Sequence, residues 1–523
     1  MKEIKIFDST LRDGAQAEGI SFSVTDKIKI AKALDELGIS FIEAGNPGSN
    51  KKDLEFFKEA KNISFRHSKL VAFGSTRRAL SEASKDANLL ALLEAETEYV
   101  CIFGKSSDFH VEKIIGTTKE ENLKMIYDTI SFLKEKGKKV FYDAEHFFDG
   151  YKSNPDYAIE TLKMACSAGA ECIILCDTNG GIFPTELEEI LDVVKKNVSC
   201  ELGIHTHNDG GMAVALSLIA VKKGCMQVQG TLLGYGERCG NANLSTIIAN
   251  LELKLGYKCL PEGNIANLTS ISREVAEISN FQLEGGMPFV GSHAFAHKAG
   301  MHIDGVYKNS KSFEHVDPES VGNERKFLIS EVAGKATVLA KINKIYPDLD
   351  KNDQRLNEII KTIKDLEFGG YQFEGADASF ELIVHKAFGD FKEYFKVNSF
   401  KTIGEGPSSN NKLSASAIIN VTVDDKEEVT GANGNGPVDA LNNALRKAIG
   451  RFYPVLNTLY LSDYKVRILD GKESATAAKT RVIIEFSDGK MTWSTVGVSR
   501  DIIDASFKAL TDAIEYKLYK ENK

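Results

Sequence analysis

Long apolar runs are absent from this chain of 523 residues. No segment approaches the roughly 18 uninterrupted apolar residues that mark a transmembrane helix. The N-terminus instead enters a short strand-like run at residues 4–7, without the charged start and long apolar stretch of a signal peptide. We therefore expect no secretion and no membrane partner.

Cysteine is also sparse, with eight residues scattered along the chain and no C-x-x-C spacing. Cys172 and Cys176 fall in one apolar run, where buried free thiols are the ordinary interpretation. A reducing, cytoplasmic setting fits this usage.

An excess of positive charge is absent as well. Lys and Arg total 65 against 74 Asp and Glu residues, which gives a formal net charge of -9. This balance argues against nucleic-acid binding as the main function. The 42% of hydrophobic and 27% of charged residues are typical of a soluble globular protein, and the length predicts two or three domains.

Eight short apolar runs alternate with amphipathic helical segments in the first half of the chain. The segment 26–37, for example, carries its apolar residues on one helical stripe. Eight strand–helix units in about 250 residues predict an α/β fold, a (β/α)8 TIM barrel, with a doubly wound open sheet as the alternative. The predicted strands are residues 4–7, 41–44, 70–73, 99–103, 140–142, 172–176, 202–204 and 227–230.

Polar side chains follow several of these strands, and in a TIM barrel all the carboxyl ends of the strands meet at one face. His205 and His207 close the seventh run, and because strand side chains alternate, both imidazoles point the same way. Alone, the pair is also compatible with an exposed polar strand end. Asp13 would add a carboxylate, and Asn241 an amide oxygen or a contact to a ligand. This mixed set favours a divalent cation such as Zn²⁺, Mn²⁺, Co²⁺ or Mg²⁺, with positions left open for a substrate.

Three further residues are candidates for the chemistry itself. Arg12 would place a fixed positive charge where an alkoxide develops, although an ion pair at the barrel mouth is the simpler alternative. Glu145 ends the fifth predicted strand, and His302 lies in an irregular segment outside the barrel. Brought together, a carboxylate and an imidazole would move a proton, whereas Glu145 alone is equally compatible with a salt bridge.

Two glycine-rich segments fail to match nucleotide-binding fingerprints. In residues 234–240 the third glycine falls one position late for a dinucleotide fold, and residues 431–437 lack the lysine of a phosphate-binding loop. The second segment instead predicts a turn that enters a helix at residues 438–449. The N-terminus of that helix would accept a carboxylate.

Residues 376–523 contain an internal repeat at an offset of 65 residues, in which Ile418-Ile419 matches Ile483-Ile484. Each copy predicts a hairpin followed by an amphipathic helix, so we expect a duplicated α+β unit whose copies cover each other's apolar faces. The predicted domains are a barrel at 1–265, a mainly helical linker at 266–375 and this α+β domain at 376–523.

Three motifs resemble those of the 2-isopropylmalate, homocitrate and citramalate synthase family, in the expected order. They are residues 11–16 (LRDGAQ), 205–209 (HTHND) and 236–241 (GERCGN), at the ends of predicted strands 1, 7 and 8. Residues 297–305 are similar to the family's linker histidine motif, which reaches an adjacent subunit's active site. Residues 434–440 are similar to its amino-acid-binding regulatory domain.

The resemblance implies a metal-dependent Claisen condensation of acetyl-CoA with a 2-oxo acid, followed by thioester hydrolysis. Residues 464–467 and 495–499 most resemble the long citramalate synthase branch, which uses pyruvate on the threonine-independent route to isoleucine. Gln16 and Thr178 would contact the substrate together with Arg12. A homodimer or larger homo-oligomer is implied, together with feedback by an amino acid, isoleucine being the first candidate.

The residues that the resemblance assigns to regulation are Gly434, Gly436, Pro437 and Asp439. One position departs from the family pattern, because Phe313 stands where many relatives carry a tyrosine before the Asp-Pro of the linker. If that hydroxyl assists catalysis, water or another group must replace it, and His315 is a nearby candidate.

Three alternatives stay open at this point. A 2-isopropylmalate or homocitrate synthase would use a different 2-oxo acid on the same barrel. A metal-dependent aldolase or lyase would share the histidine pair but would need neither acetyl-CoA nor the C-terminal domain. A non-catalytic amino-acid sensor would leave the polar barrel mouth unexplained.

Overall fold

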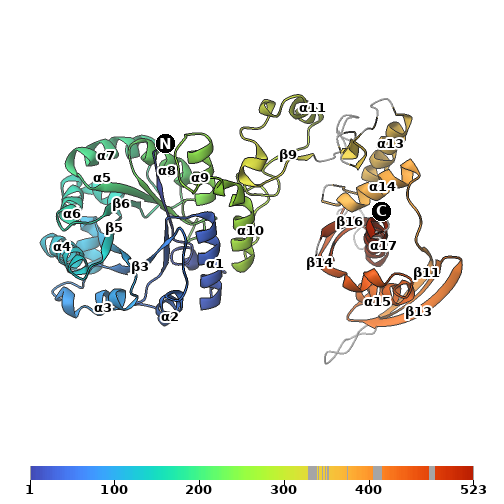
Figure 1. The fold of residues 1–523 in the computed structure, drawn as a ribbon, viewed down its shortest axis with the longest axis horizontal. Helices are drawn as coiled ribbons and strands as arrows, with labels where there is room; N and C mark the ends of the chain where they lie inside the picture. Colours follow the sequence, from blue (N-terminus) through green and yellow to red (C-terminus); the bar gives the residue numbers. More distant parts are fainter. Residues whose placement is uncertain are drawn as a thin grey trace. The chain divides into compact units, whose positions relative to one another are not determined.

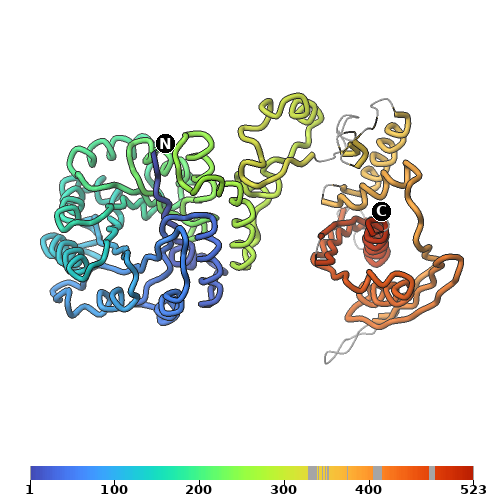
Figure 2. The backbone as a smooth tube through the Cα atoms, viewed as in Figure 1, coloured from blue at the N-terminus to red at the C-terminus, as the bar shows by residue number. Residues whose placement is uncertain are grey.

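The computed structural model describes residues 2–521 except 328–338, 340, 344, 348, 350–352, 374, 405–414, 470–477 and 490. The chain divides into two units, shown as a ribbon in Figure 1 and as a tube in Figure 2. Unit 1 contains residues 1–295 and 314–325, and unit 2 contains residues 296–313 and 326–523. Each unit is built around its own hydrophobic core.

Unit 1 is a closed barrel of eight parallel strands in sequence order. The barrel closes because β8 pairs with β1, for example through Val228 and Ile6. The TIM-barrel prediction is therefore confirmed, and the open sheet is wrong. The strands are β1 (Lys5–Asp8), β2 (Phe41–Gly45), β3 (Lys69–Ser75), β4 (Tyr99–Lys105), β5 (Lys139–Glu145), β6 (Cys172–Asp177), β7 (Glu201–Thr206) and β8 (Gln227–Gly230).

Amphipathic helices follow the strands and bury their apolar stripes against the outside of the barrel (Figure 1). The first, α1, begins at a capping box formed by Ser23 and Asp26 and ends at Gly38, whose φ of 97° is left-handed. The helices of this unit are α1 (Val24–Leu37), α2 (Lys51–Ala60), α3 (Ala87–Glu94), α4 (Lys119–Glu135), α5 (Phe147–Ser153), α6 (Pro155–Ser167), α7 (Pro184–Asn197), α8 (Ala213–Lys222), α9 (Leu244–Leu253) and α10 (Leu268–Ile278).

Aromatic rings fill the inside of the barrel. Phe7, Phe41 and Phe141 pack on one another, with the rings of Phe41 and Phe141 edge to face at a centroid distance of 4.9 Å. Because side chains repeat their direction every second residue of a strand, Glu43 and Asp143 point inward directly beyond two of these rings. The apolar layer thus gives way to a buried polar layer toward the carboxyl ends of the strands.

A disulfide joins Cys166, at the end of α6, to Cys200, immediately before β7. The two residues are 34 positions apart, so no short spacing indicated the pair, and the sequence analysis did not predict this disulfide. The connection from β6 through α7 brings them together. Cys172 and Cys176 are free and buried, as expected.

Unit 2 contains two three-stranded antiparallel sheets, each followed by a helix. This arrangement confirms the duplicated α+β fold, but each copy has three strands where a hairpin was predicted. The missed strands are the first of each copy, which are mostly exposed along their length and therefore lack apolar alternation. The elements are β11 (Lys396–Gly404), β12 (Ala415–Val423), β13 (Lys426–Gly434), α15 (Pro437–Ile449), β14 (Tyr460–Ile468), β15 (Thr480–Ser487), β16 (Thr492–Ser499) and α17 (Ile502–Glu521).

Among the described residues, five further elements precede the sheets in unit 2, as a short parallel strand pair and three helices. They are β9 (Ala296–His297), α11 (Gly300–Lys308), β10 (Lys326–Phe327), α13 (Gln354–Phe368) and α14 (Asp377–Phe388). On α14, Ser379 donates a hydrogen bond to Asp512 of α17 at 2.9 Å, and burial raises the pKa of Asp512 to about 6. Among the helices that the structure describes, none has the length and apolar character needed to cross a bilayer.

Candidate metal centre at the barrel mouth

The three ligands predicted from sequence converge at the carboxyl ends of β1 and β7. Asp13 follows β1, His205 lies in β7, and His207 stands one residue beyond that strand. One potential ligand atom of each residue lies within 4.8 Å of those of the other two, and all three side chains are buried. Since β8 pairs with both β7 and β1, closure of the barrel brings together residues almost 200 positions apart in sequence.

Asn241 lies beside these three residues, in hydrogen-bond contact with Asp13. Its Nδ2 donates hydrogen bonds to Asp13 Oδ1 and to the Tyr235 carbonyl oxygen, each at 3.0 Å. Its Oδ1 is buried without a hydrogen-bond partner among the described residues, and so is Nδ1 of His207. Buried acceptors without donors are costly unless a cation or water satisfies them. The donor set therefore fits a divalent metal.

The protonation states of the group are those that a metal requires. Burial alone would raise the pKa of Asp13, but Arg12 and the two histidines lower it to about 2. Burial lowers the pKa of His205 to about 3 and also lowers that of His207. An ionised carboxylate and neutral imidazoles follow at neutral pH.

Arg12 is fixed between two carboxylates. Its Nε lies 2.6 Å from Glu43 Oε2, its Nη1 lies 3.0 Å from Asp13 Oδ2, and its guanidinium stacks 3.8 Å from the Phe73 ring centroid. Burial would lower the pKa of Arg12, yet Glu43 and Asp13 together raise it. The result is a permanent positive charge held rigidly beside the metal ligands.

A cavity of about 240 Å³ opens above the metal group. Gln16 and Thr178, the predicted substrate contacts, both line it, and Thr178 Oγ1 accepts a hydrogen bond from the His146 backbone N–H at 2.9 Å. The lining residues are Arg12, Asp13, Gln16, Phe73, Phe103, Asp143, Glu145, Cys176, Thr178, His205, His207, Glu237 and Arg238. The structure thus gathers most of the predicted site residues around one space large enough for a small 2-oxo acid.

Glu145 has a partner that the sequence did not indicate. Lys105, the last residue of β4, forms an ion pair with Glu145 Oε2, because the two residues are register partners on neighbouring strands. A charged residue that closes an apolar run was the available signal. Glu43 and Asp143, which the sequence analysis did not single out, are both buried inside the barrel.

Glu43, Cys101 and Asp143 form a second buried group with ligand atoms within 4.8 Å of one another. Burial and Glu43 raise the pKa of Asp143 to about 7, and burial raises that of Cys101 well above its ordinary value. A thiol that stays protonated is a poor metal ligand. Cys101 therefore makes this group a poor metal site, and the group with the two histidines is the better candidate.

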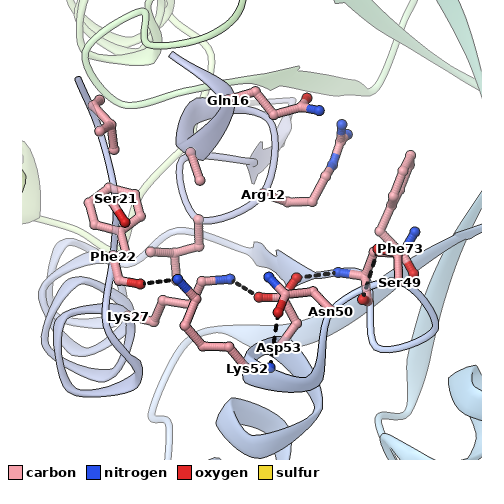
Figure 3. Close-up of a pocket in the computed structure, with 14 residues that line it drawn as sticks. Arg12, Gln16, Ser21, Phe22, Lys27, Ser49, Asn50, Lys52, Asp53 and Phe73 are labelled. Atoms are coloured by element: carbon pink, nitrogen blue, oxygen red, sulfur yellow. Dashed lines mark hydrogen bonds and ion pairs between the residues drawn. The ribbon is translucent and has the colours of Figure 1, made fainter. Parts of the chain in front are cut away.

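A second cavity of about 310 Å³ adjoins the first and shares Arg12, Gln16 and Phe73 with it (Figure 3). Its far side is formed by residues of α1 and α2. There Lys27 Nζ lies 2.5 Å from Asp53 Oδ1 and donates to the Ala44 carbonyl oxygen. Arg12 therefore borders both spaces.

His302 lies in unit 2 together with Phe313, the residue that stands where many relatives carry a tyrosine. His302 of α11 stacks on Phe313 at a centroid distance of 4.1 Å. His315 belongs to unit 1, where it packs edge to face on Phe289 and where burial lowers its pKa. The pairing of His302 with Glu145 joins residues of different units and stays a prediction, as does the replacement of the tyrosine by His315.

The residues assigned to regulation cluster at one turn of unit 2. Gly434 ends β13, Gly436 precedes α15, Pro437 opens that helix, and Asp439 accepts a hydrogen bond from the Asn435 backbone N–H at 2.8 Å. A Cβ on Gly434 would lie 2.3 Å from the Ala440 backbone nitrogen, so the close approach requires glycine. The effector role of this turn stays a prediction.

Comparison with known proteins covers nearly the whole chain. Residues 3–275 match the HMGL-like family model, residues 289–369 the homocitrate synthase post-HMGL domain-like model, and residues 374–518 the LeuA allosteric (dimerisation) domain. The (R)-citramalate synthases of Geobacter sulfurreducens and Aquifex aeolicus are 50% and 48% identical, each over 99% of this chain and 98% of their own. The chain belongs to the 2-isopropylmalate and citramalate synthase family.

Similarity also extends to more distant proteins. The 2-isopropylmalate synthase of Methanocaldococcus jannaschii is 31% identical over 99% of this chain and 96% of its own. A solved HMG-CoA lyase from Bacillus subtilis aligns with 54% of this chain and 96% of its own, at 21% identity and a TM-score of 0.47. The motifs that resemble those of the family contain Asp13, His205 and His207, the residues of the candidate metal site.

Proposed function

We propose that this family member is an (R)-citramalate synthase, an acyltransferase that condenses acetyl-CoA with pyruvate and then hydrolyses the thioester. The observation that carries the proposal is that five relatives, 44–50% identical over nearly the full chain, bear this name. The alternatives of a 2-isopropylmalate synthase and a homocitrate synthase differ from it in the 2-oxo acid.

Asp13, His205 and His207 would hold the divalent cation, Mn²⁺, Mg²⁺, Zn²⁺ or Co²⁺, with Asn241 Oδ1 as a further ligand. When bound, that cation supplies Lewis-acid polarisation of the ketone of the 2-oxo acid. Arg12, whose Nη1 lies 3.0 Å from Asp13 Oδ2, would lie beside that ketone oxygen. Its fixed charge stabilises the negative charge that develops on this oxygen as the new carbon–carbon bond forms.

Glu145 is the proposed base that removes a methyl proton from acetyl-CoA, with His302 as its predicted partner. The geometry supports this role, because Glu145 lines the oxo-acid cavity and its carboxylate is held at the cavity wall by the ion pair with Lys105. The carbanion equivalent attacks the ketone carbon, and water then cleaves the thioester to release free CoA. Gln16 and Thr178 are the proposed contacts to the carboxylate of pyruvate.

The cavity in Figure 3 is the proposed entry for the acetyl thioester, because it meets the oxo-acid cavity at Arg12 and Gln16. The LeuA-type domain indicates dimerisation and regulation. Isoleucine as the effector and a cytoplasmic location complete the proposal.

Comparative turnover is the decisive experiment. Release of free CoA from acetyl-CoA is followed with a thiol reagent in the presence of pyruvate, 2-oxoisovalerate or 2-oxoglutarate. Pyruvate should give the highest kcat/KM, and a clear preference for 2-oxoisovalerate would overturn the assignment. A reaction of the 2-oxo acid that proceeds without acetyl-CoA would favour an aldolase.

The metal assignment has its own test. The substitutions Asp13→Ala and His207→Ala should each abolish CoA release and remove the bound metal, measured by elemental analysis of the dialysed protein. Full activity in a variant that holds no metal would exclude the proposed site.

A further inference from the structure

A chain of three buried polar side chains runs across the barrel interior and ends on one of the metal ligands. His205 Nδ1 lies 3.1 Å from Gln229 Oε1, and Gln229 Nε2 donates to Asp143 Oδ1 at 3.0 Å. The three side chains come from β7, β8 and β5, and the residues are 5%, 0% and 5% exposed. His205 and Gln229 are register partners on adjacent strands, so their contact is fixed by the sheet itself.

The direction of this chain sets the tautomer of His205. Asp143 Oδ1 accepts the hydrogen bond from the Gln229 amide nitrogen, and this contact turns the amide oxygen toward the imidazole. An oxygen facing Nδ1 requires that Nδ1 carry the proton. The lone pair is then on Nε2, the nitrogen that lies 3.9 Å from Asp13 Oδ2 and faces the metal group.

The opposite orientation of the amide would disable this ligand. If Gln229 presented its NH₂ group to His205, Nδ1 would have to accept, and the proton would move to Nε2, where it blocks coordination. Nothing in the glutamine itself prefers one orientation. The choice is made by Asp143, through its hydrogen bond with the Gln229 amide nitrogen.

The other metal-binding histidine has no such partner. His207 Nδ1 is buried without a hydrogen-bond partner among the described residues, so the hydrogen-bond chain from Asp143 through Gln229 orients His205 and not His207. Gln227 offers a natural comparison, because it lies two residues before Gln229 on the same face of β8 and is fully buried. Neither of its side-chain polar atoms has a hydrogen-bond partner within the part of the chain that the structure describes.

We propose that Asp143 and Gln229 are positioning residues that hold His205 in its metal-binding tautomer. The proposal rests on the metal site of the proposed function. It predicts that loss of either residue weakens metal binding while the barrel stays folded, because neither side chain is itself a ligand. Outer-shell partners of this kind change metal affinity by about 10- to 100-fold.

The test measures metal affinity directly, on the full-length protein stripped of metal with a chelator. Co²⁺ is titrated in competition with a chromophoric chelator, and the visible absorption of bound Co²⁺ reports the ligand geometry. Gln229→Met keeps the length and burial of the side chain but removes both hydrogen bonds. It should raise the Kd for Co²⁺ about 10- to 100-fold and alter the Co²⁺ spectrum, whereas Gln227→Met should change neither.

Two variants of Asp143 separate orientation from charge. Asp143→Ala leaves the glutamine free to turn and should weaken Co²⁺ binding as Gln229→Met does, whereas Asp143→Asn retains an acceptor oxygen and should restore most of the affinity. The melting temperature of each metal-free variant shows whether the barrel is intact. If one variant fails to fold, the other still decides the question.

A Kd for Gln229→Met or Asp143→Ala within threefold of the wild type would overturn the proposal. The same result in Gln227→Met as in Gln229→Met would also overturn it, because the loss would then reflect general packing. If the wild-type protein itself binds no Co²⁺, the metal site of the proposed function fails instead. The two failures are therefore distinguishable.

Discussion

Replacing Arg12 by lysine keeps a positive charge at the barrel mouth but removes its geometry. Arg12 makes hydrogen bonds to Glu43 and Asp13 through two different nitrogens, at 2.6 and 3.0 Å, while its plane stacks on Phe73. A lysine ammonium is a single point on a flexible stem, so it cannot reproduce both contacts and the stacking at once. Arg12→Lys therefore tests whether catalysis requires the fixed geometry of the guanidinium group, in addition to its charge.

The expected loss follows from the role of the guanidinium. Removing one preorganised donor from a developing oxyanion lowers kcat by about 10²- to 10³-fold, or about 2.7–4 kcal/mol. A loose ammonium retains part of this stabilisation, so we expect Arg12→Lys to lose about 100-fold in kcat and Arg12→Ala about 1000-fold. Arg12→Ala should also unfold more easily, because it leaves the fully buried Glu43 carboxylate without its cation.

The assay follows CoA release from acetyl-CoA plus pyruvate under saturating metal, together with the melting temperature. Arg77→Lys is the matched control, since Arg77 is a buried arginine that pairs with Glu121 and Asp128 and does not line the cavity. It should lower the melting temperature and leave kcat within twofold. A kcat for Arg12→Lys within fivefold of the wild type would refute the proposal that the fixed guanidinium geometry stabilises the developing oxyanion.

Three other predictions concern stability and site geometry. Cys200→Ser removes the disulfide to Cys166, which closes a loop of 34 residues, and should lower the free energy of unfolding of unit 1 by about 4 kcal/mol on the chain-entropy account. The measurement is the urea midpoint of unfolding, with the wild-type protein in reductant as the control. A midpoint equal to that of the oxidised wild-type protein would contradict the prediction. Asp512 has a folded pKa of about 6 against an ordinary 3.8, so its acid form stabilises unit 2 at low pH and this contribution is lost as pH rises through about 6. Asp512→Asn should therefore raise stability at pH 8 by at most about 3 kcal/mol and flatten the pH dependence between pH 4 and 6; equal pH profiles for the two proteins would be the contrary result. Gly236→Ala places a Cβ 2.2 Å from Asn241 Nδ2 at a φ of 155°, and should weaken metal binding; a wild-type Kd for Co²⁺ would show that Asn241 is not displaced.

The parts of the site that could be predicted from sequence are those whose signal is local. Side chains alternate along β7, which puts His205 and His207 on one face, and the polar residues that close or follow apolar runs identified Glu145 and Asp13. Such patterns depend only on neighbouring residues. The strands and helices of the barrel were predicted for the same reason.

Long-range pairings left no comparable signal. The disulfide between Cys166 and Cys200, the ion pair between Lys105 and Glu145, and the contact of Gln229 with Asp143 each join residues at least 34 positions apart. The first strand of each C-terminal copy was missed because its exposed, mixed composition has no alternation to detect. These features exist only once the chain is closed or the sheet is paired.

The sequence by itself determined the strands and helices of the barrel, the barrel fold and the motifs of the family, because hydrophobic periodicity and residue type depend only on the order of residues along the chain. Only the tertiary structure decided that Asn241 Oδ1 has no hydrogen-bond partner among the described residues, that Arg12 is held between Glu43 and Asp13, and that Asp143 is buried with a raised pKa. Burial and distance set these properties, and both depend on which strands become neighbours. Closure of the barrel between β8 and β1 is the step that turns a set of polar strand ends into one site.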